Sequence, residues 1–492
     1  MLIQQYQGEH KIEYSIVNVS ELEGAVRIDA GYYHPVYLRN EKIIEKKNFE
    51  FLRNVVSNDY ENFKPNCDYF NYIEISNINL ETGEYIIEKI PCKNAPSRAK
   101  KLVSKDDIII STVRPNRNAV AIITHDIKNL VASTGFCKLT TKRINPKYLF
   151  ILFKTFFYRD FLVRKTTATM YPAVSEDDLI NLKIPIPPTT FQKQIENLAL
   201  SAYKEREKAD KLYKEAEDIL LEELRLKNWK PKTKKIKING KEFEEEENMS
   251  IRMLSEVIKT NRMDTEYWLP KYDDFLTLLN NLKKKDDIEL KNLSMLVDYK
   301  KGVEVGSEQY SEEGQIPFIR VSNLNEKGIN LNSAKYISGK LYNKLKEQYE
   351  PNEGEILFTK DATIGIGYLL EKPIKAIISS GILRLIVKNE KVNKEYLYLV
   401  LNSPVCKLQI NKTSSGAIIK HFKPTEVMNL LIPLLNQQTQ SKISQKIQQS
   451  FKVRRKSKEL LETAKRGVEI YIENDEQKGI NYIREQIKYG NK

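Results

Sequence analysis

The sequence predicts an α/β protein with two duplicated mixed α/β domains, separated by two long antiparallel coiled-coil helices and related by a pseudo-two-fold axis. Three observations support this architecture. "RIDAGYYHP" from Arg27 returns as "RMDTEYWLP" from Arg262, 235 residues later (262 − 27). Strand-like segments follow each copy in the same order, and a long helical pattern follows each set of strands.

The length of 492 residues allows two to four domains at roughly 100 to 200 residues each. We place a first domain at 1–188, a central helical spacer and linker at 189–250, a second domain at 251–436 and a C-terminal helical spacer at 437–492.

The strand segments of the two halves match one another. "YIEISNIN" and "FIRVSNLN" each predict a strand that ends in Ser-Asn turn chemistry, and "INPKYLFILF" and "VNKEYLYLVL" each predict a helix. The matched segments start at Tyr72 and Phe318, Asp106 and Gly354, Ser133 and Ser379, Ile144 and Val392, and Asn181 and Asn429.

Two long helices are predicted from apolar stripes. Residues 189–226 carry one stripe after Pro187 and Pro188, and residues 443–471 carry a near-heptad stripe. The helices can pair as an antiparallel coiled coil, or can lie on separate domains. Between them, residues 230–248 form a basic and then an acidic block, which predicts a solvated connector.

Composition favours a polyanionic partner. Lys and Arg total 80 against 66 Asp and Glu, a net charge of +14, although AT-biased genomes produce a similar lysine excess. The four cysteines form no C-x-x-C pair, which argues against a disulfide framework and a zinc site and fits a reducing cytoplasm. No signal sequence or membrane span is visible, so we expect a soluble, cytoplasmic protein.

Motifs for catalysis are missing from the sequence. There is no [ND]-P-P-[YF] tetrapeptide of an amino-methyltransferase and no G-x-x-x-x-G-K-[ST] phosphate loop. Gly365 and Gly367 predict a tight strand bend, and acidic residues before the apolar strands predict solvated turns. The four histidines have no partner at metal-ligand spacing, so no metal is expected.

The duplicated order of segments resembles the specificity subunit of type I restriction-modification systems, over nearly the whole chain. The resemblance is carried by "IPFIRVSNLN" at 316–325, "EGEILFTKDATIG" at 353–365 and "IPIPPTTFQKQI" at 184–195. The first half departs from it, with "IIISTVRPNRNAV" in place of "TKDATIGIG", so we expect the two domains to recognise different bases.

The resemblance implies a non-catalytic subunit with two target-recognition domains that read a bipartite, asymmetric site in double-stranded DNA. It implies two methyltransferase (M) subunits and restriction (R) subunits as partners, which methylate adenine or cleave. S-adenosylmethionine and ATP would then bind those partners, with no cofactor in this chain. The alternatives are a protein-binding scaffold with incidental charge, and a single-chain fused enzyme.

DNA contacts are expected from polar loops beside the strands, because Lys and Arg neutralise phosphates while Arg, Asn and Lys can also bond base edges. In the first domain the candidates are Arg98, Lys100, Lys101, Arg114, Asn116, Arg117, Asn118, Arg164, Lys165, Thr166, Thr167 and Tyr171. In the second they are Lys300, Lys301, Arg320, Asn323, Lys360, Lys412, Ser414, Ser415, Lys420 and His421. Any one of these can instead be an ordinary solvated or structural residue.

The repeated R-x-D-x-x-Y motif is predicted to be structural. We expect Asp29 and Asp264 to pair with Arg27 and Arg262 or to cap a helix, and the aromatic residues to pack at the entrance of each domain.

Overall fold

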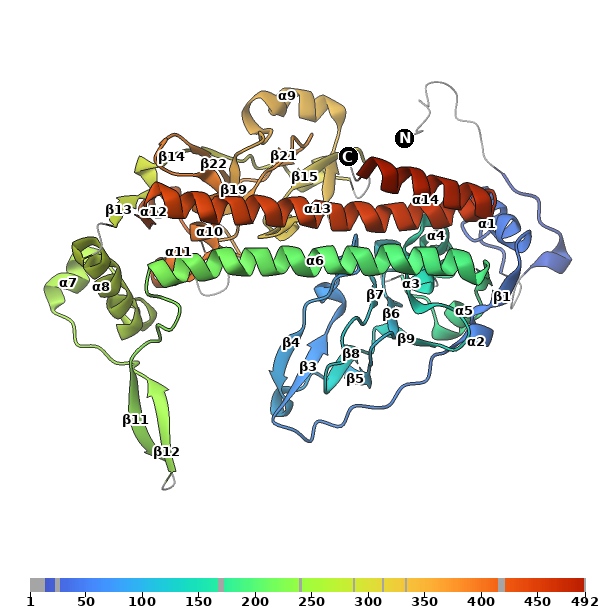
Figure 1. Cartoon of the computed structure of the whole chain (residues 1–492), viewed down its shortest axis with the longest axis horizontal. Coiled ribbons are helices and arrows are strands. Elements are labelled where there is room, and N and C mark those ends of the chain that lie inside the picture. The colour runs from blue at the N-terminus through green and yellow to red at the C-terminus, as the bar shows by residue number, and fades with distance from the viewer. Residues whose placement is uncertain are drawn as a thin grey trace. The chain divides into compact units, whose positions relative to one another are not determined.

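The computed structural model describes residues 14–22, 27–166, 172–238, 241–285, 288–311, 314–331, 334–414 and 421–490 (Figure 1). The chain forms two compact units. Unit 1 comprises Met1–Arg206 and Arg455–Lys492, and unit 2 comprises Glu207–Arg454. Each unit therefore combines one set of strands with part of each long helix.

Unit 1 contains two four-stranded sheets, ordered β2-β9-β6-β7 and β4-β3-β8-β5, and the pair β1-β10. All neighbours are antiparallel except β3 and β8, which are parallel. The strands are β1 (Phe49–Phe51), β2 (Val56–Ser57), β3 (Tyr69–Ile73), β4 (Glu88–Pro91), β5 (Ala99–Leu102), β6 (Ile108–Ser111), β7 (Val120–Ile122), β8 (Leu130–Ser133), β9 (Phe136–Thr141) and β10 (Lys183–Pro185).

The core helix of unit 1 is α3 (Pro146–Lys154), which is buried from Tyr148 onwards. It starts where Asn145 accepts the N–H groups of residues 147 and 148, and Pro146 occupies its first position. A helix that is apolar all round belongs inside a core. The other helices of this part are α1 (Pro35–Glu45), α2 (Leu52–Val55), α4 (Phe156–Arg164) and α5 (Glu176–Ile180).

Unit 2 has a sheet ordered β14-β22-β19-β20, a second sheet β18-β15-β21, and the pairs β13-β23 and β16-β17. The strands are β13 (Glu289–Asn292), β14 (Val297–Lys301), β15 (Ile316–Ile319), β16 (Leu324–Asn325), β17 (Gly328–Ile329), β18 (Lys335–Ile337), β19 (Ile356–Thr359), β20 (Gly367–Leu369), β21 (Ile377–Ile378), β22 (Ile382–Val387) and β23 (Leu431–Leu434). The helices are α7 (Leu254–Thr260), α8 (Pro270–Lys285), α9 (Gly339–Tyr349), α10 (Lys394–Asn402), α11 (Pro404–Thr413) and α12 (Pro424–Met428).

The strand order of unit 2 corresponds to that of unit 1, as the matched sequence segments predict. The parallel pair β15-β21 stands where unit 1 has β3-β8. One element differs: where β5 borders β8 in unit 1, helix α9 contacts β21 in unit 2.

Two buried hydrogen bonds recur in both units. Tyr148 Oη donates to the Pro185 carbonyl at 2.9 Å, and Tyr396 Oη donates to the Pro433 carbonyl at 2.6 Å. Gln192 and Gln440 in turn each accept, at 3.0 Å, the backbone N–H of the residue that caps the core helix. The same side chains thus tie the core helix of each unit to the start of a long helix.

The long helices α6 (Thr189–Glu223) and α13 (Gln437–Glu473) each have one part in unit 1 and one in unit 2, and α14 (Glu476–Gly490) follows in unit 1. In unit 1 the Ser457 hydroxyl donates to the Ala202 carbonyl, and in unit 2 Ser450 donates to Ala209, both at 2.7 Å. Within unit 2, Lys446 pairs with Glu215 and Arg454 pairs with Asp210, so residue numbers rise along one helix as they fall along the other and the paired parts run antiparallel.

The segment expected to be a solvated connector contains a hairpin, β11 (Thr233–Ile238) with β12 (Lys241–Glu246). Its register places lysine opposite glutamate at Lys234 and Glu245. Opposite charges across two antiparallel strands favour pairing. The basic block followed by the acidic block was therefore a hairpin signal.

The expectation of no disulfide framework is wrong for one pair of cysteines. Cys67 and Cys92 form a disulfide that joins the segment before β3 to the end of β4, where the ladder pairs Tyr69 with Pro91. The antiparallel ladder brings these cysteines together across 25 residues, a separation that carries no sequence motif. Cys137 and Cys406 are buried free thiols.

Every helix in the described parts of the chain is too short or too polar to cross a bilayer.

Candidate nucleic-acid interface

The turn between β8 and β9 is the centre of the candidate site in unit 1. Thr134 donates its backbone N–H to the Arg98 carbonyl at 2.9 Å, which fixes the start of β5. Thr112 donates its N–H to the Gly135 carbonyl at 2.9 Å, which fixes the loop after β6. The predicted groups around Arg98 and Arg114 are therefore held on the same turn.

The loop after β6, residues 112–118, has an unusual backbone. Arg114 and Asn118 both adopt left-handed conformations, with φ of 50° and 53°, on either side of a short 3-10 turn at Pro115–Arg117. Non-glycine residues in this region store strain that often accompanies function. Asn116 and Arg117 are exposed at the tip, while Pro115 is buried beneath it.

The residues that directly follow a second predicted loop, 172–174, lie against the first one. The Arg114 N–H donates to the Pro172 carbonyl at 2.7 Å, and the Val174 N–H donates to the Thr112 carbonyl at 2.9 Å. Residues 172–174 therefore lie beside the loop at residues 112–118.

Unit 2 builds the same site around residues 379–381. Lys360 donates its N–H to the Gly381 carbonyl at 2.9 Å, and Phe422 donates its N–H to the Lys360 carbonyl at 2.8 Å. Ser379 donates its N–H to the carbonyl of Ile319, the residue before Arg320. Lys301 ends the neighbouring strand β14, opposite the start of β22. The predicted groups of unit 2 thus converge as those of unit 1 do.

The R-x-D-x-x-Y motifs form two matching structures, which we call clasps. In the first, Arg27 pairs with Asp29 at 2.5 Å and lies over the ring of Tyr32 at 4.3 Å. Asp29 also accepts the N–H of Tyr32 at 2.9 Å. In addition, Arg27 donates to the carbonyl of Thr166 at 3.1 Å, two residues after the end of α4.

The second clasp repeats these contacts. Arg262 pairs with Asp264 at 2.6 Å, lies over Tyr267 at 4.7 Å and donates to the carbonyl of Thr413 at 3.0 Å. The pairing lowers the pKa of Asp264, chiefly through the hydrogen bond from Arg262. The structural interpretation of the motif is confirmed, and its link to the loop base was not visible in the sequence.

Four candidate residues are engaged in internal contacts. Lys101 is buried and pairs with Glu176 at 2.5 Å, while Arg164 is buried and pairs with Glu41 at 2.7 Å. Asn323 is fully buried and holds its own 3-10 turn by accepting the Arg320 N–H. Lys412 pairs with Asp273 at 3.1 Å, and burial lowers its pKa. These side chains face the interior, so we leave them out of the proposed interface.

The remaining candidates divide by exposure. Those that are exposed are Arg98, Lys100, Asn116, Arg117, Lys300, Lys301 and His421, of which His421 contacts Asp361. Those that are partly buried are Arg114, Asn118, Lys165, Thr166, Arg320, Lys360 and Ser414. Thr167, Tyr171, Ser415 and Lys420 lie outside the described residues.

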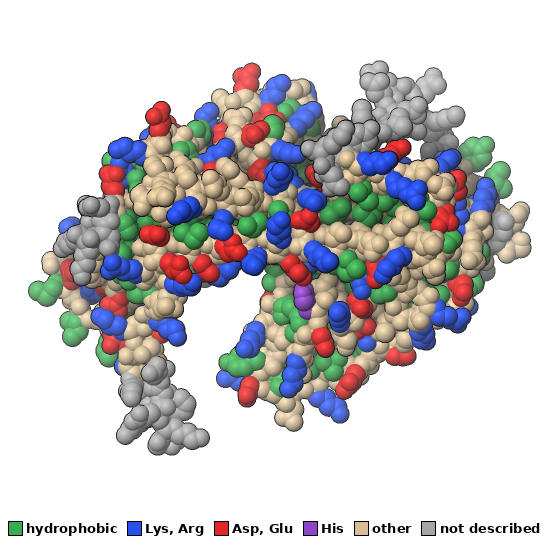
Figure 2. All heavy atoms as spheres, in the orientation of Figure 1, with side chains coloured by type: hydrophobic (Ala, Val, Ile, Leu, Met, Phe, Trp, Pro, Cys, Tyr) green, Lys and Arg blue, Asp and Glu red, His purple; other side chains and the backbone are tan. Residues whose placement is uncertain are grey.

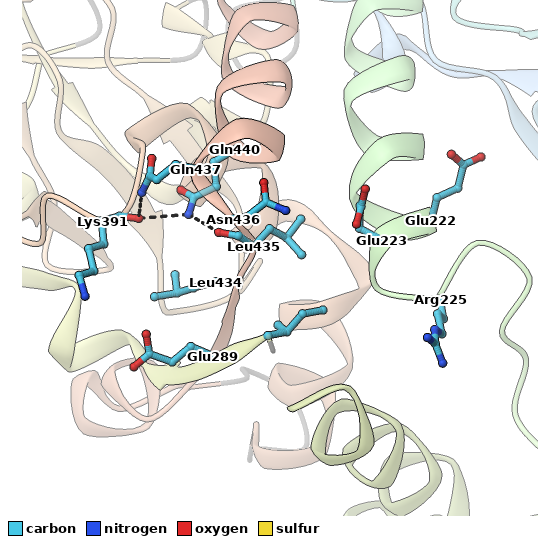
Figure 3. A pocket seen from close by; sticks show the side chains of 11 residues that line it. Glu222, Glu223, Arg225, Glu289, Lys391, Leu434, Leu435, Asn436, Gln437 and Gln440 are labelled. Carbon is cyan, nitrogen blue, oxygen red and sulfur yellow. Dashed lines mark hydrogen bonds between the residues drawn. The ribbon is translucent and has the colours of Figure 1, made fainter. Parts of the chain in front are cut away.

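A cavity of about 810 Å³ in unit 2 contains none of the candidates (Figure 3). It lies between the end of α6 and the start of α13, lined by Glu222, Glu223 and Arg225 among others. In Figure 3, Gln437 and Gln440 both donate to the carbonyl of Lys391. No group of three His, Cys, Asp or Glu residues able to hold a metal occurs among the described residues. We therefore leave this cavity out of the candidate interface.

The sequence matches the family described as the type I restriction modification DNA specificity domain at residues 37–203 and 285–465, which together exceed half of the chain. The chain belongs to this family. The two matched regions include the turns at residues 133–135 and 379–381, around which the candidate loops lie.

Relatives of this family support the assignment. The chain is 22% identical over 393 residues to the type I restriction enzyme MjaVIII specificity subunit of Methanocaldococcus jannaschii, covering 78% of this chain and 82% of that protein. It is 28% identical over 127 residues to the HindI specificity subunit of Haemophilus influenzae, covering 24% of this chain and 28% of the relative.

Solved structures of the family are similar as well. The HsdS subunit from Thermoanaerobacter tengcongensis is 20% identical, with 87% of this chain and 97% of that chain covered and a TM-score of 0.31. The S subunit from M. genitalium is 11% identical, with 90% and 95% covered and a TM-score of 0.33.

Proposed function

We propose that this chain is the DNA-reading subunit of its type I restriction-modification complex, in which each unit reads one half of a bipartite, asymmetric target. The supporting observation is the convergence of predicted polar loops around one turn in each unit, residues 133–135 and residues 379–381. The loops themselves differ, since Arg114 and Arg117 have no basic counterpart in "ATIG". Different side chains on a common scaffold suit two different half-sites.

The chain acts without catalysis in this proposal. Two methyltransferase subunits and, for cleavage, restriction subunits supply the chemistry, and they bind S-adenosylmethionine and ATP. The complex works in the cytoplasm on double-stranded DNA, where adenines of the target are methylated or the DNA is cut.

The helices α6 and α13 serve as the spacer between half-sites in this proposal. Deletion of residues 203–209 together with residues 451–457 removes a matched segment from both helices. The interval between the two half-sites should then change while the half-sites stay the same, as seen by mapping methylated adenines. An unchanged interval would contradict the role of spacer.

The main test reconstitutes the complex from the purified chain and the methyltransferase subunit of the same organism, with S-adenosylmethionine. We expect adenine methylation at one bipartite sequence, and no methyl transfer by either protein alone. DNA binding by the chain should weaken steeply with salt, because phosphate contacts release counterions. Salt-independent or undetectable DNA binding would favour the protein scaffold, and methyl transfer by the chain alone would favour a fused enzyme.

A further inference from the structure

The duplication extends upstream of the clasps to two segments with exposed apolar side chains. We call residues 14–22 with 27–28 the first entry segment, and residues 249–263 the second. Ser15 donates its hydroxyl to the carbonyl of Tyr33 at 2.5 Å, and Ser250 donates to the carbonyl of Trp268 at 2.6 Å. The donor and the acceptor of the second bond each lie 235 positions after those of the first, as Arg262 lies 235 positions after Arg27.

Apolar side chains of the two entry segments are exposed to solvent at matching positions. Ile16 is 86% exposed and its counterpart Ile251 is 97% exposed. The other matched pairs are also more than two-thirds exposed, namely Tyr14 with Met249, Val19 with Leu254, and Ile28 with Met263. Figure 2 shows hydrophobic side chains gathered over α7, in the second segment. Single exposed apolar residues are common, but such a cluster marks an interaction surface.

The chemistry of these segments favours a protein partner over DNA. Arg252 pairs with Asp273, and Arg262 pairs with Asp264 at 2.6 Å, so these two cations are already neutralised within the unit. A phosphate backbone is recognised by cations, whereas an apolar surface is covered by another apolar surface.

The comparison of the two halves indicates what this partner is. The recognition loops have diverged, as "TVRPNRN" and "KDATIG" show, whereas the entry segments keep the serine bond, the clasp and the apolar positions. A surface that is retained in both halves of one chain fits a partner that binds in two copies. We propose that each entry segment docks one methyltransferase subunit, so that the chain binds two copies through equivalent apolar contacts. This inference rests on the proposed function.

Each clasp also places the docked partner next to a recognition surface. Arg27 and Arg262 donate to the carbonyls of Thr166 and Thr413, where the helices α4 and α11 lead into the polar loops. The docking surface and the recognition surface of one unit thus share a side chain. A methyltransferase held there lies beside the half-site that the unit reads.

The test uses the full chain, co-purified with the methyltransferase subunit, in three variants. Ile16→Ser with Val19→Ser alters the first segment, Ile251→Ser with Leu254→Ser alters the second, and the third variant combines all four changes. Native mass spectrometry should find two methyltransferase subunits on the wild type, one on each single-segment variant and none on the combined variant. Affinity at an altered segment should fall by at least roughly tenfold.

Matched controls are Ile86→Ser in unit 1 and Met295→Ser in unit 2, because these side chains are also exposed, at 67% and 56%, but lie outside the segments. The controls should keep both methyltransferase subunits. Urea unfolding and salt-dependent DNA binding of the chain alone should be unchanged in all variants, since the altered side chains pack against little of their own unit.

Three outcomes overturn the inference: the combined variant retains both methyltransferase subunits, it loses DNA binding by the chain alone, or the wild-type chain self-associates through these segments. If the wild type itself binds no methyltransferase subunit, the proposed function fails instead. The two failures are therefore distinguishable in one experiment.

Discussion

The last residue of the core helix differs between the two units, and both versions support the loop above it. In unit 1 this residue is Lys154, whose ammonium group donates to the carbonyls of Leu80 and Asn118. In unit 2 it is Asn402, whose side-chain amide accepts the Gly367 N–H and donates to the Gly367 carbonyl, both at 2.9 Å. The amine of a buried lysine and the side-chain amide of an asparagine thus perform one supporting task. The support has diverged together with the loop it holds.

A second matched position shows the same divergence. In unit 2, Arg384 forms two hydrogen bonds to the carboxylate of Glu355, at 2.6 and 2.7 Å. In unit 1 the corresponding pair is Lys138 and Asp107, at 3.3 Å. The clasps, in contrast, keep the same residues in both units. The ion pair beneath the strands has therefore changed between the units, whereas the arginine–aspartate pair of each clasp has not.

The largest expected effect is on the buried pair of unit 2. Arg384→Met leaves Glu355 buried without its cation, which should lower the free energy of unfolding by about 3 to 5 kcal/mol. Lys138→Met should cost less, because it removes one 3.3 Å contact of a less buried cation instead of two short hydrogen bonds. Urea unfolding, with hydrogen exchange to locate the change, measures both variants. Equal losses would show that the two pairs are energetically equivalent.

The pH dependence of this pair has a defined sign. Burial opposes ionisation of Glu355, but hydrogen bonds from Arg384 and Asn352 outweigh it and hold its pKa below the usual value. The stabilisation is therefore present above the unfolded pKa and lost as pH falls through the folded one. Arg384→Met should remove this acid sensitivity from unit 2.

The next effect is on DNA reading. Arg114→Ala with Arg117→Ala should weaken recognition of one half-site only, by about 1 to 3 kcal/mol for each lost base contact. Lys100→Ala is the matched control, since it removes an exposed cation of the same unit and should lower affinity for all sequences alike. Binding to DNA with one half-site altered at a time measures the difference. A loss shared by both half-sites would assign the arginines to phosphate contacts.

A smaller effect is expected on the pH dependence of stability, to which Lys154 contributes and Asn402 does not. Burial and, to a lesser extent, the nearby Lys465 lower the pKa of Lys154 to about 7, against the opposing effect of Glu462 and Glu81. Between pH 7 and about 10 the unfolded chain then holds a proton that the folded chain lacks, so stability of unit 1 rises with pH. The slope is at most about 1.4 kcal/mol per pH unit.

Lys154→Met should remove that slope, whereas Lys100→Met, which alters an exposed lysine of the same unit, should leave it in place. Unfolding by urea at pH 7, 8 and 9 provides the measurement. A slope that persists in Lys154→Met would mean that the ammonium group stays charged on its two carbonyl acceptors.

The smallest effect concerns the left-handed residue that ends each loop. Asn118 has φ of 53° and Gly365 has φ of 87°. Gly365→Ala should destabilise unit 2 by about 1 kcal/mol, both through this conformation and because the added Cβ would lie 2.8 Å from Ile410. Asn118→Gly should be close to neutral, since relief of strain offsets a 3.3 Å hydrogen bond to Lys154. Thermal unfolding of the Gly365→Ala and Asn118→Gly variants measures both effects.

The sequence predicted the duplicated order of strands, the start of the first long helix at Thr189 and the pairing within each clasp. These features depend on local spacing and apolar periodicity. Both could be checked by comparing the two halves of the sequence. The support residues Lys154 and Asn402 were missed, although they lie 248 positions apart, as Gln192 and Gln440 do.

The sequence predicted which segments carry candidate DNA contacts, but not which of their side chains are exposed. Arg164 is a charged residue at the end of α4, and the sequence suggested that its side chain is exposed. In the structure it is buried and donates hydrogen bonds to Glu41 and to the Tyr32 carbonyl. Lys101 alternates with the exposed Lys100 along β5, so one of the two had to face inward. Which one does so depends on the partner sheet, and that is tertiary information.

The small residues between the two long helices recur every seven positions, at Ala202, Ala209 and Ala216 and again at Ser450, Ser457 and Ala464. All six are buried. A matched loss of seven residues from both helices would place Ser450 against Ala202 and leave a small residue facing a small residue. Each such step shortens a helix by about 10.5 Å, close to three base pairs of DNA at about 3.4 Å each. If α6 and α13 are the proposed spacer, its length can change without loss of this packing only in steps of about 10.5 Å, which is nearly a whole number of base pairs.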